Sequence, residues 1–210
     1  MVDAPAPCSE PATTVGVGSA RVDIYTHIRV VIGIVIGLGL THLLRGIARL
    51  IEHPKREGIW WVHLLWVLSM FLYLIHFWWF EFELGAITQW NFLIYLFLIG
   101  YAVLLYVLCA LLFPEDISDY DGFRGYFLAR RHWFFGVLAS VFALDFADTW
   151  LKGSAHFVTL GPEYIARGVV FIVLSLIAMR TSDRRYHAAF ATLGVLYQVF
   201  YMVRLYYVQY

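Results

Sequence analysis

The sequence predicts an all-α integral membrane protein, a bundle of six transmembrane helices with one short interfacial helix between the third and the fourth. Hydrophobic residues make up 61% of the 210 residues and charged residues only 14%, whereas soluble domains carry about 45–50% and about 25%. The apolar residues also gather into runs of roughly 20, the length that crosses a lipid bilayer as a helix. We therefore expect a single transmembrane domain over 23–210, after a tail over 1–22 whose Pro, Ala, Thr and Gly content predicts disorder.

Six apolar segments have the length of a span, and short turns rich in Gly, Pro or charged residues separate them. In chain order they cover residues 25–50, 59–84, 89–113, 130–151, 159–180 and 185–208. The longest connection, over 114–129, opens with Pro114 and two acidic residues, a pattern typical of a helix start. This connection is therefore expected to hold the interfacial helix.

The first span contains Gly33 and Gly37, whose spacing of four residues allows a second helix to approach closely. Packing within the monomer is one use of this face, and a homo-oligomer seam is the other. The sequence leaves both open.

The distribution of Lys and Arg sets the expected orientation of the spans. If both termini lie outside, ten of the 15 basic residues lie on the inner side, which is the bias of cytoplasmic loops. We therefore expect a multi-pass protein of the plasma (inner) membrane with both termini on the outer side. The net charge of zero gives no electrostatic footprint for nucleic acid. Cys8 and Cys109 are too few for a disulfide framework or a thiolate metal site.

Two acidic residues, Asp145 and Asp148, lie inside the fourth span, three residues apart and so on one helix face. An ionisable residue within a span is a functional-site hypothesis by default. Helix rise places several polar residues of other spans at a similar depth: Arg29, His76, Glu83, Arg167, Tyr201 and Arg204. This outer cluster is either a salt-bridge network that fixes helix register or a hydrated, outward-open cavity that binds an ion or small solute.

The short aspartate side chains cannot reach the headgroups as long arginines can. We therefore expect Asp145 or Asp148 to lie within salt-bridge distance of Arg167, Arg29 or Arg204. A buried carboxyl that has neither a cation nor water keeps its proton, so the cluster is expected to enclose water and to respond to external pH.

A second polar group, made of Thr41, His42, Arg45 and His63, lies near the inner boundary. It is either an inner gate or proton relay, or a set of ordinary interfacial residues. His42 and His63 are also the nearest approach to a pair of haem b ligands. No His pair has the i, i+4 spacing of a zinc enzyme, so a metal site would need residues from several spans: His27, His76, Asp145 and Asp148.

No catalytic signature is present, and the expected function is non-enzymatic. The leading interpretation is a small channel, transporter or membrane sensor that uses the outer cluster and is linked to protons. One alternative is a haem b electron-transfer protein, and the other is an accessory or structural subunit of a membrane complex.

Overall fold

The computed structural model describes residues 15–53, 58–87, 89–153 and 160–208, and all regular secondary structure in these ranges is helical. The long helices are α1 (Val15–Glu52), α2 (Trp61–Phe80), α3 (Phe92–Leu112), α4 (Gly122–Leu151), α6 (Gly161–Arg180) and α7 (Arg184–Val208), and the 3₁₀ helix η1 (Glu81–Ala86) extends α2. The predicted all-helical class is confirmed. Over the described residues, five of the helices, α1 to α4 and α6, are long and apolar enough to cross a membrane, whereas α7 is not among them.

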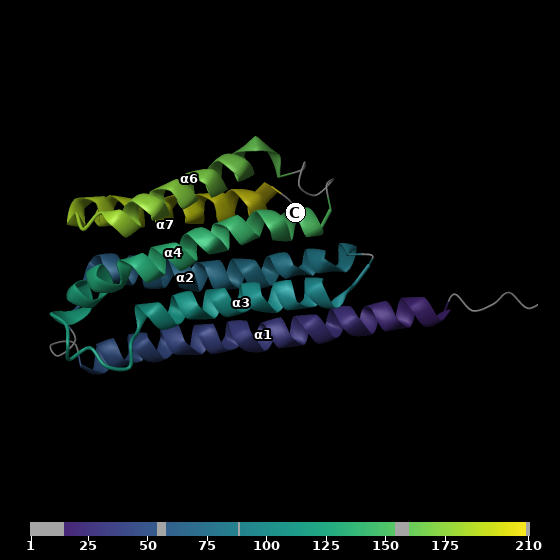
Figure 1. Cartoon of the computed structure of the whole chain (residues 1–210), viewed down its shortest axis with the longest axis horizontal. Helices are drawn as coiled ribbons and strands as arrows, with labels where there is room; N and C mark the ends of the chain where they lie inside the picture. Colours follow the sequence, from purple (N-terminus) through teal and green to yellow (C-terminus); the bar gives the residue numbers. More distant parts are fainter. Residues whose placement is uncertain (1–14, 54–57, 88, 154–159, 209–210) are drawn as a thin grey trace, which may run out of the picture.

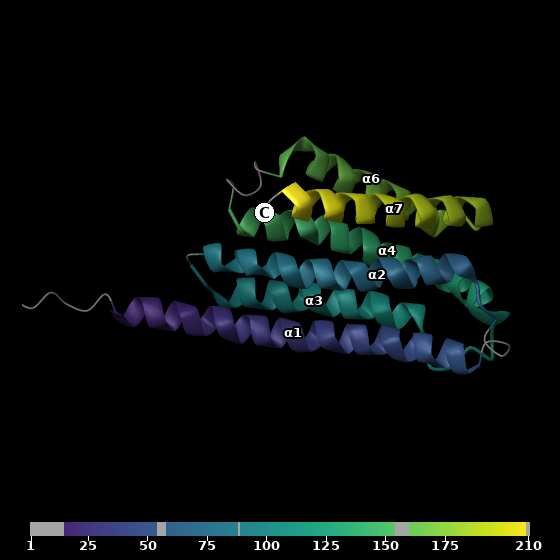
Figure 2. The same cartoon turned by 180° about the vertical axis from the view of Figure 1, so that it is seen from behind.

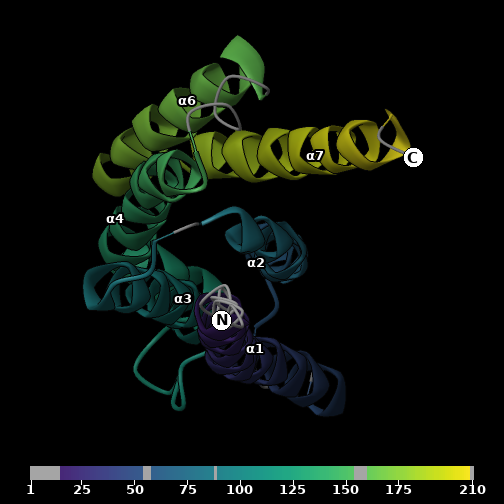
Figure 3. The same ribbon diagram turned by 90° about the vertical axis from the view of Figure 1, so that its right-hand side faces the viewer.

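The long helices lie lengthwise beside one another (Figures 1 and 2). Helix α4 lies in the middle, packed against α3 on one side and α6 on the other, while α1 packs against α3 and α7 packs against α2. Viewed along the bundle, α1, α2 and α3 group on one side of α4, and α6 and α7 on the other (Figure 3). Helix α1 begins, and α7 ends, at the same end of the bundle (Figure 1).

The core forms from apolar stripes at helical spacing. On α2 the buried residues include Met70, Leu74 and Phe77, and outward-facing positions such as Leu68 and Ile75 are also apolar. The same holds for α1, α6 and α7, whose exposed faces are rich in Val, Ile and Leu. A helix that is apolar all round suits a membrane span rather than a surface in water.

One of the two paired glycines of α1 is used within the chain. A Cβ at Gly33 would lie 2.9 Å from the Trp78 ring, so the glycine lets α2 pack closely there. Among the described residues, apart from its neighbours and the backbone of its own helix, no heavy atom lies within 4 Å of such an atom at Gly37. Packing within the monomer thus accounts for Gly33 but not for Gly37.

The predicted interfacial helix is wrong. Residues 114–121 form bends and turns, and the rest of the expected segment belongs to α4, which begins at Gly122 rather than at residue 130. Asp116 accepts a hydrogen bond from the backbone N–H of Ser118 (2.8 Å), so this acid stabilises a turn instead of a helix start. Phe123 and Phe127 are buried against His63, and this packing explains the early start of α4.

Helix α1 begins at Val15, inside the range that was expected to be disordered. The remainder of that tail, residues 1–14, lies outside the described residues.

Candidate functional site

Asp145 of α4 lies at the centre of a polar network inside the bundle. Its Oδ1 accepts a hydrogen bond from the hydroxyl of Tyr101 (3.3 Å), and its Oδ2 accepts one from the hydroxyl of Tyr164 (2.9 Å). Nη2 of Arg167 lies 3.5 Å from the same Oδ2, and the two side chains are only 14% and 17% exposed. The predicted pairing of Asp145 with Arg167 is therefore confirmed.

Hydroxyl groups extend this network away from the carboxylate. The Tyr73 hydroxyl lies 3.2 Å from the Tyr101 hydroxyl, which donates onward to Asp145. On the other side, the Thr149 hydroxyl lies 2.8 Å from that of Tyr164. Asp145 thus joins α2, α3, α4 and α6 through side chains that can donate and accept hydrogen bonds.

Close packing of α4 and α6 brings Arg167 to Asp145. The residue after Arg167 is Gly168, where a Cβ would lie 2.3 Å from the ring of Phe146. A larger residue there would push the two helices apart. The Arg167 guanidinium also lies over the Tyr201 ring, 4.5 Å from its centroid, a distance at which the ring face attracts a cation.

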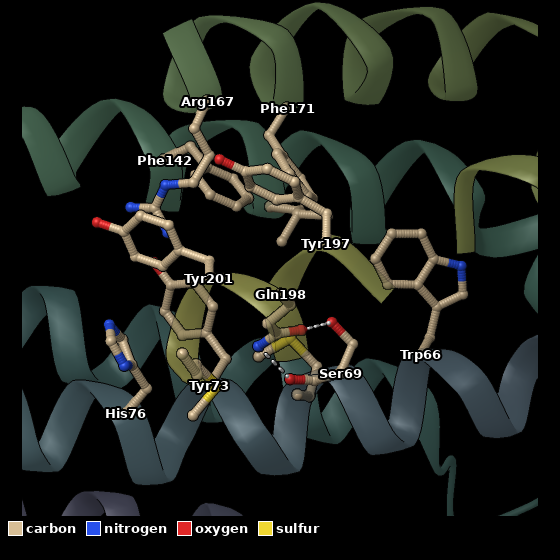
Figure 4. Close-up of a pocket in the computed structure, with 13 residues that line it drawn as sticks. Trp66, Ser69, Tyr73, His76, Phe142, Arg167, Phe171, Tyr197, Gln198 and Tyr201 are labelled. Atoms are coloured by element: carbon tan, nitrogen blue, oxygen red, sulfur yellow. Dashed lines mark hydrogen bonds between the residues drawn. The ribbon is translucent and has the colours of Figure 1, made fainter. Parts of the chain in front are cut away.

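Two adjoining cavities open beside this pair. The first, of about 30 Å³, lies between α2, α4, α6 and α7 (Figure 4), where Ser69 and Gln198 bond to each other across its floor (2.7 Å). The second, of about 20 Å³, adds Asp145 and Asp148 to the lining. The residues that line both are Tyr73, His76, Arg167 and Tyr201. These volumes are of the order of one water molecule, so the site suits water or a proton rather than an organic solute.

A buried ion-pair triad lies one turn further along α4. Nζ of Lys152 lies 2.6 Å from Oδ2 of Asp148 and 3.0 Å from Oε1 of Glu81, and all three side chains are at most 2% exposed. Lys152 directly follows α4 as its C-cap, and the next residue, Gly153, has a positive φ of 121°. A cation at a helix C-terminus also interacts favourably with the helix dipole.

Sequence reasoning missed Glu81 and Lys152 and expected Glu83 in their place. Glu83 is exposed, because α2 ends at Phe80 and the tighter η1 turn places Glu81 inside instead. A signal was present, since Glu81 follows Leu74 by seven residues and so continues the buried stripe of α2. Lys152 likewise follows Asp148 by four residues, the spacing of a helical ion pair.

The two outer arginines do not pair with the aspartates. The Arg29 guanidinium lies 4.1 Å over the Phe82 ring and donates to the Tyr25 hydroxyl (3.3 Å). Arg204 forms an ion pair with Glu163, in which both side chains are more than one third exposed. Tyr201 and His76 do lie at the site: both line the cavities, and their rings are 6.5 Å apart.

Two of the four residues of the inner polar group, His42 and His63, cap a helix. Nε2 of His63 donates to the carbonyl of Leu112 (2.7 Å) and Nε2 of His42 to that of Phe113 (3.0 Å). These carbonyls lie at the end of α3, where helical partners are lacking. Thr41 donates to the carbonyl of Gly37 in its own helix (2.7 Å), and Arg45 is exposed.

Both histidines proposed as haem ligands therefore use Nε2 to cap α3. Within the described residues, no three His, Cys, Asp or Glu side chains are placed to hold a metal ion. In particular, His27 is exposed on α1 and stacks on Tyr95 rather than facing the two aspartates.

Comparisons with protein-family models, curated proteins and solved structures give no match to this chain. Its function is therefore inferred from the site.

Proposed function

We propose that this chain is a multi-pass plasma-membrane protein that binds and releases a proton at Asp145 and acts as a small proton-linked transporter or sensor. The observation that carries the proposal is the position of Asp145. It is an acid within a membrane-length helix, paired with one arginine and placed beside a water-sized cavity. Such an intramembrane carboxylate is a recurrent element of proton pathways.

The arrangement supplies what a proton site needs. Ionised Asp145 is stabilised by Arg167 and by two tyrosine hydroxyls. When Asp145 takes a proton its charge disappears, and the attraction that holds Arg167 to α4 disappears with it. Arg167 then keeps the Tyr201 ring as its neighbour. Protonation is thereby linked to the contact between α4 and α6.

In the proposed topology six helices cross the membrane, α7 included, with both termini on the outer side. The even number of crossings agrees with the positions of the start of α1 and the end of α7 at one end of the bundle (Figure 1). Exposed tryptophans also support an interfacial belt, with Trp61 and Trp133 toward one boundary and Trp79 and Trp150 toward the other. Ten of 15 basic residues then lie inside.

The test reconstitutes purified parent and Asp145→Asn protein in liposomes and follows proton flux with an internal pH-sensitive dye across a pH series. Tryptophan fluorescence is recorded in parallel, because Trp66 lines the cavity and reports its state if the protein is a sensor. The matched control is Glu163→Gln, which removes an acid that is more than one third exposed.

We expect a pH-dependent flux or fluorescence change in the parent and in Glu163→Gln, and its loss in Asp145→Asn. If parent and Asp145→Asn behave identically at every pH in both measurements, the network is a structural salt bridge and the proposal is wrong.

A further inference from the structure

A single ammonium group serves two carboxylates in the triad of Glu81, Asp148 and Lys152. All three side chains are buried, and Nζ of Lys152 lies 2.6 Å from Asp148 but 3.0 Å from Glu81. An ionised carboxylate without a full countercharge is costly to bury. The ammonium group therefore balances the charge of Glu81, which lies at the longer distance, less well than that of Asp148.

The surroundings of the second oxygen of Glu81 agree with this order. Oε2 of Glu81 is inaccessible to solvent and has no hydrogen-bond partner among the described residues. An ionised carboxylate would bury this oxygen without a hydrogen bond in place of its hydration. A proton on the carboxyl removes its net charge, so that a neutral group is buried instead of an ion.

We propose that Glu81 is a second proton-binding site, which holds a proton on Oε2 while Asp148 and Lys152 remain an ion pair. The ligand is a proton, which bonds covalently to Oε2 and needs no further space. On release the proton leaves and its bonding electron pair stays on the Glu81 carboxylate.

The other charged and titratable groups near Glu81 agree with this assignment. From α4, Asp145 and Asp148 add negative charge and Lys152 supplies the positive charge. From α1, Tyr25 and Arg29 contact the backbone carbonyl and the ring of Phe82, respectively, and not the Glu81 carboxylate. His76, one turn before η1 on α2, stacks on Phe80.

The second site is linked to the first through Asp148. Asp148 binds Lys152 and also lines the cavity of Asp145, one turn away on the same helix. A proton that binds to Asp145 removes a negative charge near Glu81 and so makes proton release from Glu81 easier. This use of the site rests on the proposed function, but the presence of a proton on Glu81 does not.

The experiment is infrared spectroscopy of the full chain in lipid vesicles, recorded in H₂O and D₂O across a pH series. A protonated carboxyl has a C=O stretching band that an ionised carboxylate lacks, and exposed glutamates ionise near pH 4.3, so they contribute little of it at neutral pH. We expect this band in the parent at neutral pH. The band should disappear in Glu81→Gln. It should persist in Glu83→Gln, which replaces an exposed acid of the same short helix.

Glutamine has the shape of a protonated glutamate. The melting temperature of Glu81→Gln should therefore equal that of the parent within experimental error. The inference is wrong if the parent lacks the band at neutral pH, if Glu81→Gln keeps it, or if Glu81→Gln unfolds while Glu83→Gln does not. Asp145→Asn separates the two proposals. It should abolish the flux or fluorescence response and keep the Glu81 band, which should be lost at a lower pH than in the parent because one negative charge near Glu81 is gone.

Discussion

Replacing Arg167 with leucine tests whether Asp145 depends on a buried cation. The two charged atoms are 3.5 Å apart and both side chains are less than one fifth exposed. At an effective dielectric constant of about 20, this separation corresponds to about 5 kcal/mol of attraction. Asp145 keeps its hydrogen bonds from Tyr101 and Tyr164 in the variant, and these offset part of the loss. We therefore expect Arg167→Leu to lose about 3 kcal/mol, the lower end for a broken buried pair.

Thermal unfolding of the purified protein in detergent, followed by circular dichroism, measures this loss. About 3 kcal/mol corresponds to a fall of about 6–12 °C in the melting temperature of a chain of this size. The double variant Arg167→Leu, Asp145→Asn removes both charges and keeps an acceptor for the two tyrosines. It should recover most of the loss.

Arg204→Leu is the matched control, since it removes an arginine whose ion pair with Glu163 is largely exposed. Such pairs contribute little to stability, so its melting temperature should stay close to that of the parent. If Arg167→Leu and Arg204→Leu melt alike, or if the double variant is no better than Arg167→Leu, the pairing does not stabilise the bundle and the reasoning fails.

Three further predictions concern packing, pH and topology. Gly168→Ala should destabilise by about 1–3 kcal/mol because its Cβ meets a ring 2.3 Å away, whereas Gly37→Ala, with nothing within 4 Å, should be neutral or stabilising in the same melt. Burial lowers the pKa of Lys152, but the charge of Asp148, together with the contact to Glu81, outweighs this effect and holds that pKa above its ordinary value. The stability it contributes is therefore complete below about pH 10.4 and is lost as the pH rises through the folded-state pKa; alkaline melts should show this decline in the parent and not in Lys152→Met. For topology, an impermeant thiol reagent added outside should label Cys8 and not Lys55→Cys, and the reverse pattern would overturn the orientation.

The positions of the helices were predictable because the apolar runs and the turn residues between them are local features of the chain. The segments expected over 89–113 and 185–208 correspond to α3 (Phe92–Leu112) and α7 (Arg184–Val208) within three residues. The start of α4 was not predictable in this way. Its first two turns are stabilised by the burial of Phe123 and Phe127 against α2, and a contact between distant segments leaves no periodic pattern at the site itself.

The candidate site was predictable only in part, for a related reason. Depth along a helix follows from counting residues, so the meeting of Asp145 with Arg167 could be expected. Glu81 and Lys152 lie at helix ends. Counting residues along each span predicts that such positions lie at the membrane interface and not in the interior of the bundle. Their burial depends on the η1 turn and on the end of α4 at Lys152, which are details of the backbone.

The negative charges of Asp145 and Asp148 are balanced by cations from different segments of the chain. This difference gives the two acids different roles in the proposed function. Asp145 is paired with Arg167 of another helix, so a change in its charge alters the contact between α4 and α6. Asp148 is paired with Lys152, four residues further along its own segment, so a proton gained or lost at Glu81 leaves that local pair intact. In the proposed function, a proton at Asp145 therefore acts on the contact between two helices, whereas a proton at Glu81 acts on the electrostatic potential at Asp145. Asp145 is accordingly suited to be the switch, and Glu81 to set the pH at which the switch responds.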